Sequence, residues 1–184
     1  EIELNIDLFE SVAKRPKNKK FEKKVFVSRN LSFNKIFNTF PSKEYLFFQT
    51  AAASGYYGVK SVKIWSKNNY VKLIDKLLND DFKIVISGSK SELNYNNLIS
   101  KNFNNSNLVD LTGKHTLVET IHMIKNSFLA LTPDSGLMHI ADALKVKLLA
   151  IYGPTDLTRT SPSSKDSYVL KSSRHCLGCL AKPG

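Results

Sequence analysis

Residues 128–156, which decide the fold, read FLALTPDSGLMHIADALKVKLLAIYGPTD. The apolar pattern predicts a strand over 128–131, a helix over 135–144 and a second strand over 147–152. Both strands are almost wholly apolar, which is typical of strands buried on both faces of a parallel sheet. A strand–helix–strand unit of this length predicts parallel pairing within an α/β fold.

The same alternation continues on both sides of this stretch. The predicted strands elsewhere cover residues 25–27, 45–49, 82–86, 107–111 and 168–170. The predicted helices elsewhere cover residues 67–79, 91–100 and 117–124. We therefore expect a Rossmann-like parallel sheet with helices on both faces. We expect residues 45–184 to form this domain, and residues 1–44 to be a connector that carries a basic run from Lys14 to Lys24.

The composition is that of a globular protein with an excess of positive charge. The chain has 184 residues, 42% of them hydrophobic, and only two cysteines, which excludes a disulfide-rich scaffold. Its 27 basic and 16 acidic side chains give a net charge of +11, which suggests an anionic partner. No stretch approaches the roughly 20 apolar residues of a membrane span. The N-terminus is acidic and lacks an initiating Met, so we expect the chain to be a fragment.

The loop after the first of these two strands predicts an anion site. Asp134 or Ser135 would cap the helix, whose first N–H groups lack internal partners and carry partial positive charge. Gly136 would let a phosphate approach that backbone, and His139 lies one turn on. The alternative is an ordinary turn and cap with a packed core histidine.

Three other loops hold polar residues where strands end, which is where open α/β sheets bind ligands. Lys63 follows a small-residue loop and is suited to a phosphate. Glu92 could hold ribose hydroxyls, or it could only satisfy the first turn of a helix. Thr155 and Asp156 offer a hydroxyl and a carboxylate in a tight loop.

Together these segments resemble glycosyltransferase family 9, the ADP-heptose:lipopolysaccharide heptosyltransferases, from about residue 45 to the end. The resemblance rests on five motifs in order: Lys63-Ile64-Trp65, Ser87-Gly88 with Glu92, Leu111 to Leu117, Asp134 to His139, and Gly153 to Asp156. The last two are intact. The chain departs from the family at Ile64, at an extra residue around His115, and at Ala51 to Ala53, where hydroxyl residues are common.

The resemblance implies the C-terminal, donor-binding domain of a GT-B glycosyltransferase, with the acceptor surface and catalytic base in an N-terminal domain. It implies transfer of heptose from ADP-heptose to a lipopolysaccharide core, by an inverting reaction that needs no cofactor. Lys63 would stabilise the departing diphosphate, and Glu92 would hold the ribose. The remaining donor-binding residues would be Asp134, Ser135, Gly136, Leu137, Met138, His139 and Thr155.

Two other functions stay open: a protein O-heptosyltransferase, and a non-catalytic module that binds nucleotides or polyanions. The basic run could lie against lipopolysaccharide or an anionic membrane surface, or be a solvated linker. No motif supports nucleic-acid binding. Cys176 and Cys179 form a C-x-x-C pair, which is a weak candidate for half of a metal site and could equally be a redox pair or an ordinary surface loop. We expect a cytoplasmic location, with peripheral attachment to the inner membrane as an option.

Overall fold

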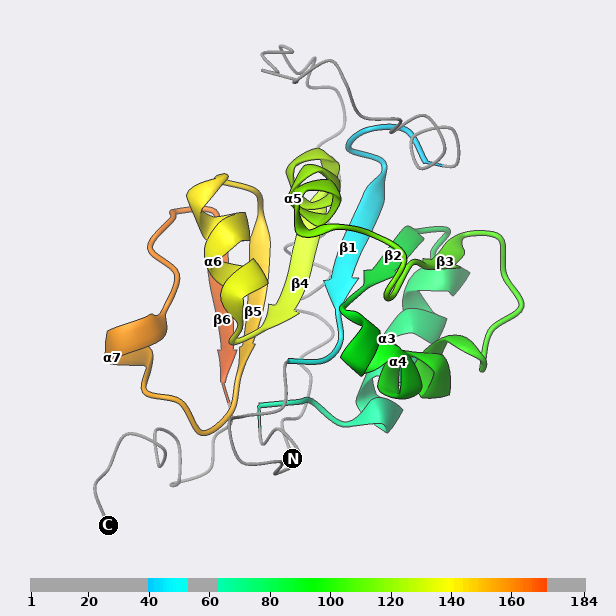
Figure 1. Cartoon of the computed structure of the whole chain (residues 1–184), viewed down its shortest axis with the longest axis horizontal. Coiled ribbons are helices and arrows are strands. Elements are labelled where there is room, and N and C mark those ends of the chain that lie inside the picture. Colours follow the sequence, from blue (N-terminus) through cyan, green and yellow to red (C-terminus); the bar gives the residue numbers. More distant parts are fainter. Residues whose placement is uncertain (1–39, 53–62, 172–184) are drawn as a thin grey trace.

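A computed structural model describes residues 40–52 and 63–171, and its centre is a single parallel sheet (Figure 1). The sheet order is β3-β2-β1-β4-β5-β6, and every neighbouring pair is parallel. The strands are β1 (Tyr45–Gln49), β2 (Lys83–Ser87), β3 (Leu108–Asp110), β4 (Leu129–Pro133), β5 (Leu148–Tyr152) and β6 (Ser167–Lys171). The predicted Rossmann-like sheet is therefore confirmed.

Helices cover both faces of this sheet. They are α3 (Lys67–Asn79), the 3₁₀ turn η1 (Lys90–Glu92), α4 (Leu93–Ser100), α5 (Leu117–Asn126), α6 (Gly136–Ala143) and α7 (Leu157–Thr160). In Figure 1, α3 and α4 lie together beneath the β2 side, while α5 and α6 lie over β4 and β5. Apolar side chains divide in the same way, because those of α3 and α4 pack in one buried cluster and those of α5 and α6 in another.

Successive side chains of each strand point to alternate faces, which explains how one sheet contributes to two cores. In β1, Leu46 and Phe48 belong to the α3–α4 cluster, whereas Tyr45 and Phe47 belong to the α5–α6 cluster. Successive strand residues point to opposite faces, so a wholly apolar strand is required when helices cover both. The sheet is thus the shared wall of both cores.

The helices α3 and α5 begin directly after polar N-cap residues, which precede the stretch of regularly spaced apolar residues. Ser66 accepts a hydrogen bond from Asn69 N and caps α3, which spans the predicted residues 67–79. Thr116 caps α5 together with Glu119. The predicted helix at 91–100 differs at its start, because its first turn is the 3₁₀ turn η1. The short helix α7 was not predicted, since four residues carry no periodicity.

Two sequence predictions remain partly outside the described residues. The strand predicted at 25–27 lies outside them, as does most of the connector assigned to residues 1–44. Phe40, within that connector, is buried against the α5–α6 cluster. The boundary at residue 44 therefore stays a prediction.

The strand order determines where a ligand site can form. The chain adds β2 and β3 on one side of β1, and then β4, β5 and β6 on the other. The helices that follow β1 and β4, namely α3 and α6, consequently pack on opposite faces, which leaves the carboxyl ends of these two neighbouring strands open to ligands. Gln49 ends β1, and Asp134 and Ser135 directly follow β4.

Candidate functional site

The N-terminus of α6 provides unused backbone donors at these strand ends. Ser135 is the N-cap, and its Oγ accepts a hydrogen bond from Met138 N at 3.4 Å. No described residue accepts from the N–H groups of Gly136 and Leu137, as expected for the first turn of a helix. A Cβ added at Gly136 would meet nothing within 4 Å. The helix end therefore has the free N–H groups and the open approach that the prediction requires, and anion binding there stays a prediction.

The residues that follow in α6 have unequal roles. Met138 is fully buried in the α5–α6 cluster, so only its backbone faces the site. His139 is exposed, which excludes the packed core histidine considered as the alternative. Of these two side chains, only that of His139 is accessible to a ligand.

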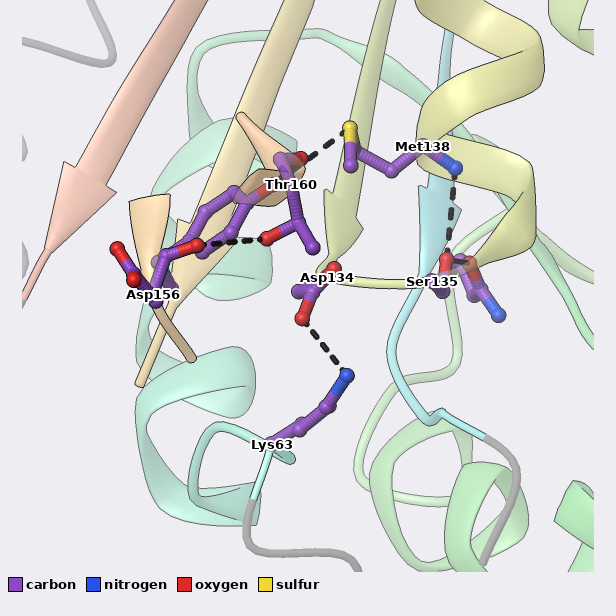
Figure 2. Close-up of polar contacts among 8 residues, drawn as sticks. Lys63, Asp134, Ser135, Met138, Asp156 and Thr160 are labelled. Carbon is purple, nitrogen blue, oxygen red and sulfur yellow. Dashed lines mark hydrogen bonds and ion pairs between the residues drawn. The ribbon is translucent and has the colours of Figure 1, made fainter. Parts of the chain in front are cut away.

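An ion pair joins the α6 loop to the segment before α3. Lys63 Nζ lies 2.7 Å from Asp134 Oδ2, and Figure 2 shows the lysine pointing toward the aspartate. The Asp134 side chain is 5% exposed, whereas that of Lys63 is 34% exposed. Two predicted site residues that are 71 positions apart are therefore in direct contact.

Gln49 is a residue that sequence reasoning missed. Ser135 Oγ donates a hydrogen bond of 2.6 Å to Gln49 Oε1, which ties the end of β1 to the start of α6. Gln49 is only 6% exposed. The available signal was an amide at the end of an otherwise apolar strand, Tyr45-Leu46-Phe47-Phe48.

Glu92 packs against the loop that follows β2. It is 7% exposed, and its Oε2 accepts a hydrogen bond from Ser89 N at the start of η1. A Cβ added at Gly88 would lie 2.8 Å from that same oxygen. Glu92 Oε2 thus satisfies a backbone N–H group of the first turn, which was the alternative considered from the sequence. No described residue donates a hydrogen bond to the other oxygen, Oε1.

Asn96, on α4, joins the ends of β1 and β3 through a buried network that the sequence did not indicate. Thr50, after β1, donates to Asn96 Oδ1, and Asn96 Nδ2 donates to Thr112 Oγ1, after β3, at 2.7 Å. All three residues are at most 1% exposed. Gly113 N also donates to Gly88 O at 2.8 Å, so the loops after β2 and β3 are fastened together.

The loop after β5 is held in shape by hydrogen bonds among residues of the same segment. Asp156 caps α7 by accepting from Thr158 N, and Tyr152 donates its hydroxyl hydrogen to Thr160 O. Burial raises the pKa of Tyr152 to about 12, so the phenol stays a donor at neutral pH. Thr155 Oγ1 is buried and has no hydrogen-bond partner among the described residues, which leaves this predicted site residue unsatisfied.

His115 occupies the loop before α5. Burial lowers the pKa of its imidazole, Glu119 opposes that effect, and Lys114 adds to it. Its Nε2 is buried without a partner in the described part of the chain. The ring is therefore held neutral at pH 7.

The described residues hold no cluster of three or more His, Cys, Asp or Glu side chains that could bind a metal ion. Cys176 and Cys179 lie outside those residues, so the C-x-x-C pair stays a prediction. Within residues 40–52 and 63–171, no helix is both long and apolar enough to cross a membrane.

Each comparison with known proteins finds members of the same family of glycosyltransferases. The sequence model for glycosyltransferase family 9 (heptosyltransferase) matches residues 2–183. Lipooligosaccharide heptosyltransferase 2 of Haemophilus influenzae is 32% identical over 112 residues, which cover 59% of this chain and 32% of that protein. The chain therefore aligns with about a third of the length of this curated relative.

Solved structures agree with the sequence match. The ADP-heptose lipopolysaccharide heptosyltransferase II of E. coli superimposes with a TM-score of 0.65 at 27% identity, covering 74% of this chain and 41% of that one. A family 9 glycosyl transferase from Veillonella parvula gives a TM-score of 0.65 at 21% identity, covering 76% of this chain and 38% of that one. The second likeness supports the fold alone.

Proposed function

The chain belongs to glycosyltransferase family 9, and from that membership we propose that it is the donor-binding part of an enzyme that transfers heptose from ADP-heptose to a lipopolysaccharide core. The observation that carries the proposal is the group of residues at the carboxyl ends of the neighbouring strands β1 and β4. There the free N–H groups of α6 lie beside a lysine that reaches over from the segment before α3. Helix N-termini of this kind bind phosphate, as a nucleoside diphosphate requires.

Lys63 is proposed to contact the diphosphate and to stabilise its charge as it departs. Its side chain is 34% exposed, so solvent and ligand can reach it, while the buried Asp134 holds its ammonium group in position. Preorganised charge of this kind stabilises a leaving group without reorganisation during the reaction. Gly136 and Leu137 would donate their backbone N–H groups to the same phosphates.

The nucleoside is proposed to lie toward β2 and β3. Glu92 has one oxygen engaged with Ser89 N, and its Oε1 is assigned to the ribose hydroxyls. The buried Asn96 network holds the loops after β1 and β3 on either side of this position. His139 and Thr155 are assigned to the sugar-phosphate end of the donor, at α6 and after β5.

The acceptor belongs to the same proposal and rests on the family and the named relatives. The E. coli structure at 27% identity is described as an ADP-heptose lipopolysaccharide heptosyltransferase. We assign the lipopolysaccharide core as acceptor and peripheral contact with the inner membrane on this basis. No described residue is assigned as the catalytic base.

Calorimetric titration of the 184-residue chain with ADP, UDP and GDP at two salt concentrations tests the donor site. ADP should bind more tightly than UDP or GDP, and its binding should survive added salt, because shape and hydrogen bonds select the base. Lys63→Ala should weaken ADP binding about tenfold. Lys72→Ala, an exposed lysine on α3, is the matched control and should bind like the parent.

Weak binding of all three nucleotides that added salt abolishes would contradict the proposal. That result would mean that the net charge of +11, and not a shaped site, attracts the ligands. The non-catalytic polyanion-binding alternative would then account better for the chain.

A further inference from the structure

Gln49 is a buried amide at the ligand edge of the sheet. It is the last residue of β1, it is 6% exposed, and it lies beside the N-terminus of α6 through its contact with Ser135. No described residue accepts a hydrogen bond from its Nε2. Nε2 is not among the fully buried polar atoms without a partner in the described part of the chain, so solvent or a ligand oxygen can reach it.

Ser135 determines which end of the amide is available. Its hydroxyl donates to Gln49 Oε1 at 2.6 Å while accepting from Met138 N. The carbonyl end of the glutamine is therefore occupied, and the NH₂ group is left as a donor. Phosphate oxygens accept hydrogen bonds and, when ionised, do not donate them.

The charges around this position favour a neutral donor. Lys63 is already paired with Asp134, so the two side chains together contribute no net charge. Asp134 thus offsets part of the attraction of Lys63 for a phosphate, and neutral dipoles add to it, namely the N–H groups of Gly136 and Leu137 and any amide directed to the same point. Gln49 is the buried side-chain amide in contact with the cap of α6.

We propose that Gln49 is a further donor-binding residue, whose Nε2 donates a hydrogen bond to a phosphate oxygen of the nucleoside diphosphate held at the N-terminus of α6. The inference rests on the proposed function, since it assumes that a nucleoside diphosphate occupies this edge. It adds a contact from β1 to those from α6 and Lys63. The residue therefore discriminates between ligands with and without phosphate.

The test measures binding of ADP and of adenosine to the 184-residue chain and to two variants. Gln49→Glu keeps an acceptor for Ser135 but replaces the amide donor with a negative charge. Gln49→Met has a similar size and neither polar group. We expect ADP affinity to fall about tenfold in Gln49→Met and about a hundredfold in Gln49→Glu. Adenosine affinity, followed by NMR at millimolar concentrations, should be unchanged in both.

The control is Asn79→Asp, which adds one negative charge at the exposed end of α3, at the opposite edge of the sheet. It should bind ADP like the parent, and circular dichroism should show all variants folded. ADP binding that is unchanged in both Gln49 variants would overturn this inference and leave the proposed function intact. Equal losses for ADP and adenosine would also overturn it, because they would indicate a structural role. A parent chain that binds no ADP would overturn the proposed function and this inference together.

Discussion

Lys63 and Asp134 form an ion pair whose two members differ in burial. The Asp134 side chain is 5% exposed and that of Lys63 34% exposed, so removing the lysine leaves a buried charge without its partner. Leaving a buried acceptor unpaired costs about 1–3 kcal/mol. We therefore expect the pair to affect both stability and ligand binding, and the two effects are separable by mutation.

Lys63→Met should lower the free energy of unfolding by about 1–2 kcal/mol and weaken ADP binding about tenfold. The double variant Lys63→Met/Asp134→Asn should regain most of the stability, because the unpaired charge is gone, but not the ADP affinity. Urea unfolding and calorimetry measure the two quantities. A double variant that binds ADP like the parent would show that Lys63 does not contact the phosphates.

Gly136 and Gly88 make a matched pair of glycines. A Cβ at Gly136 meets nothing within 4 Å, whereas one at Gly88 would lie 2.8 Å from Glu92 Oε2 and 3.1 Å from Asn96 Nδ2. The first glycine borders open space and the second is required by packing.

Gly136→Ala should keep or raise stability, by up to about 1 kcal/mol, since alanine favours the helix. It should nevertheless weaken ADP binding about tenfold, because the methyl group takes the space in which a phosphate approaches the backbone. Gly88→Ala should instead destabilise the fold by about 1–2 kcal/mol through overpacking. Thermal unfolding and ADP titration of both variants provide the comparison. A Gly136→Ala chain that binds ADP with parental affinity would show that the phosphates do not bind at the N-terminus of α6.

At the scale of elements, Asp142 fastens α6 to the segment that leads into β6. Its carboxylate accepts hydrogen bonds from the backbone N–H groups of Ser163 and Ser164 and from the hydroxyls of Ser163 and Ser167. Partial burial tends to raise the pKa of Asp142, but these hydrogen bonds outweigh it and hold the pKa below its usual value of 3.8. The ionised carboxylate thus stabilises the folded chain.

Asp142→Asn should lower stability at pH 6 by about 1 kcal/mol, because hydrogen bonds to a charged acceptor are replaced by weaker ones. The folded pKa is depressed, so the contribution of Asp142 is present above about pH 3.8 and disappears as the pH falls through the folded value. The difference between parent and variant should therefore shrink between pH 5 and pH 2.5 in urea titrations. Asp75→Asn, at an exposed position on α3, is the control, and a parent–variant difference independent of pH would contradict the assignment.

At the scale of the whole molecule, the two apolar cores share one sheet. Trp65, the only tryptophan, is 4% exposed in the α3–α4 cluster and contacts Tyr70 edge-on at 4.9 Å between ring centroids. Each strand contributes side chains to both clusters, so neither face can separate from the sheet while the other stays packed. This arrangement predicts cooperative unfolding of the described domain.

Unfolding in urea should therefore give the same midpoint by Trp65 fluorescence, which reports one face, and by far-ultraviolet circular dichroism, which reports the whole sheet. Saturating ADP should raise both midpoints together, since a ligand that binds only the folded chain stabilises all of it. A fluorescence change that precedes the loss of circular dichroism would show that the α3–α4 face opens separately.

The sequence by itself determined the kind and order of the elements. Helix α3 and strand β1 have the predicted bounds, and the other predicted strands within 40–52 and 63–171 shift by no more than two residues at either end. Hydrophobic periodicity and capping residues are local properties, so they can be seen in one stretch of sequence. The loops after β2, β4 and β5 could be singled out for the same reason, because each follows directly on a recognisable strand.

The tertiary structure alone decided which side chains meet. Gln49 contacts Ser135 across 86 positions, and Lys63 meets Asp134 across 71. Asn96 joins the ends of β1 and β3 from a helix. Such contacts depend on the order of strands in the sheet and on which face each side chain takes. Local periodicity contains neither property. The motifs could therefore identify the loops, but only the fold shows which of their side chains lie in contact.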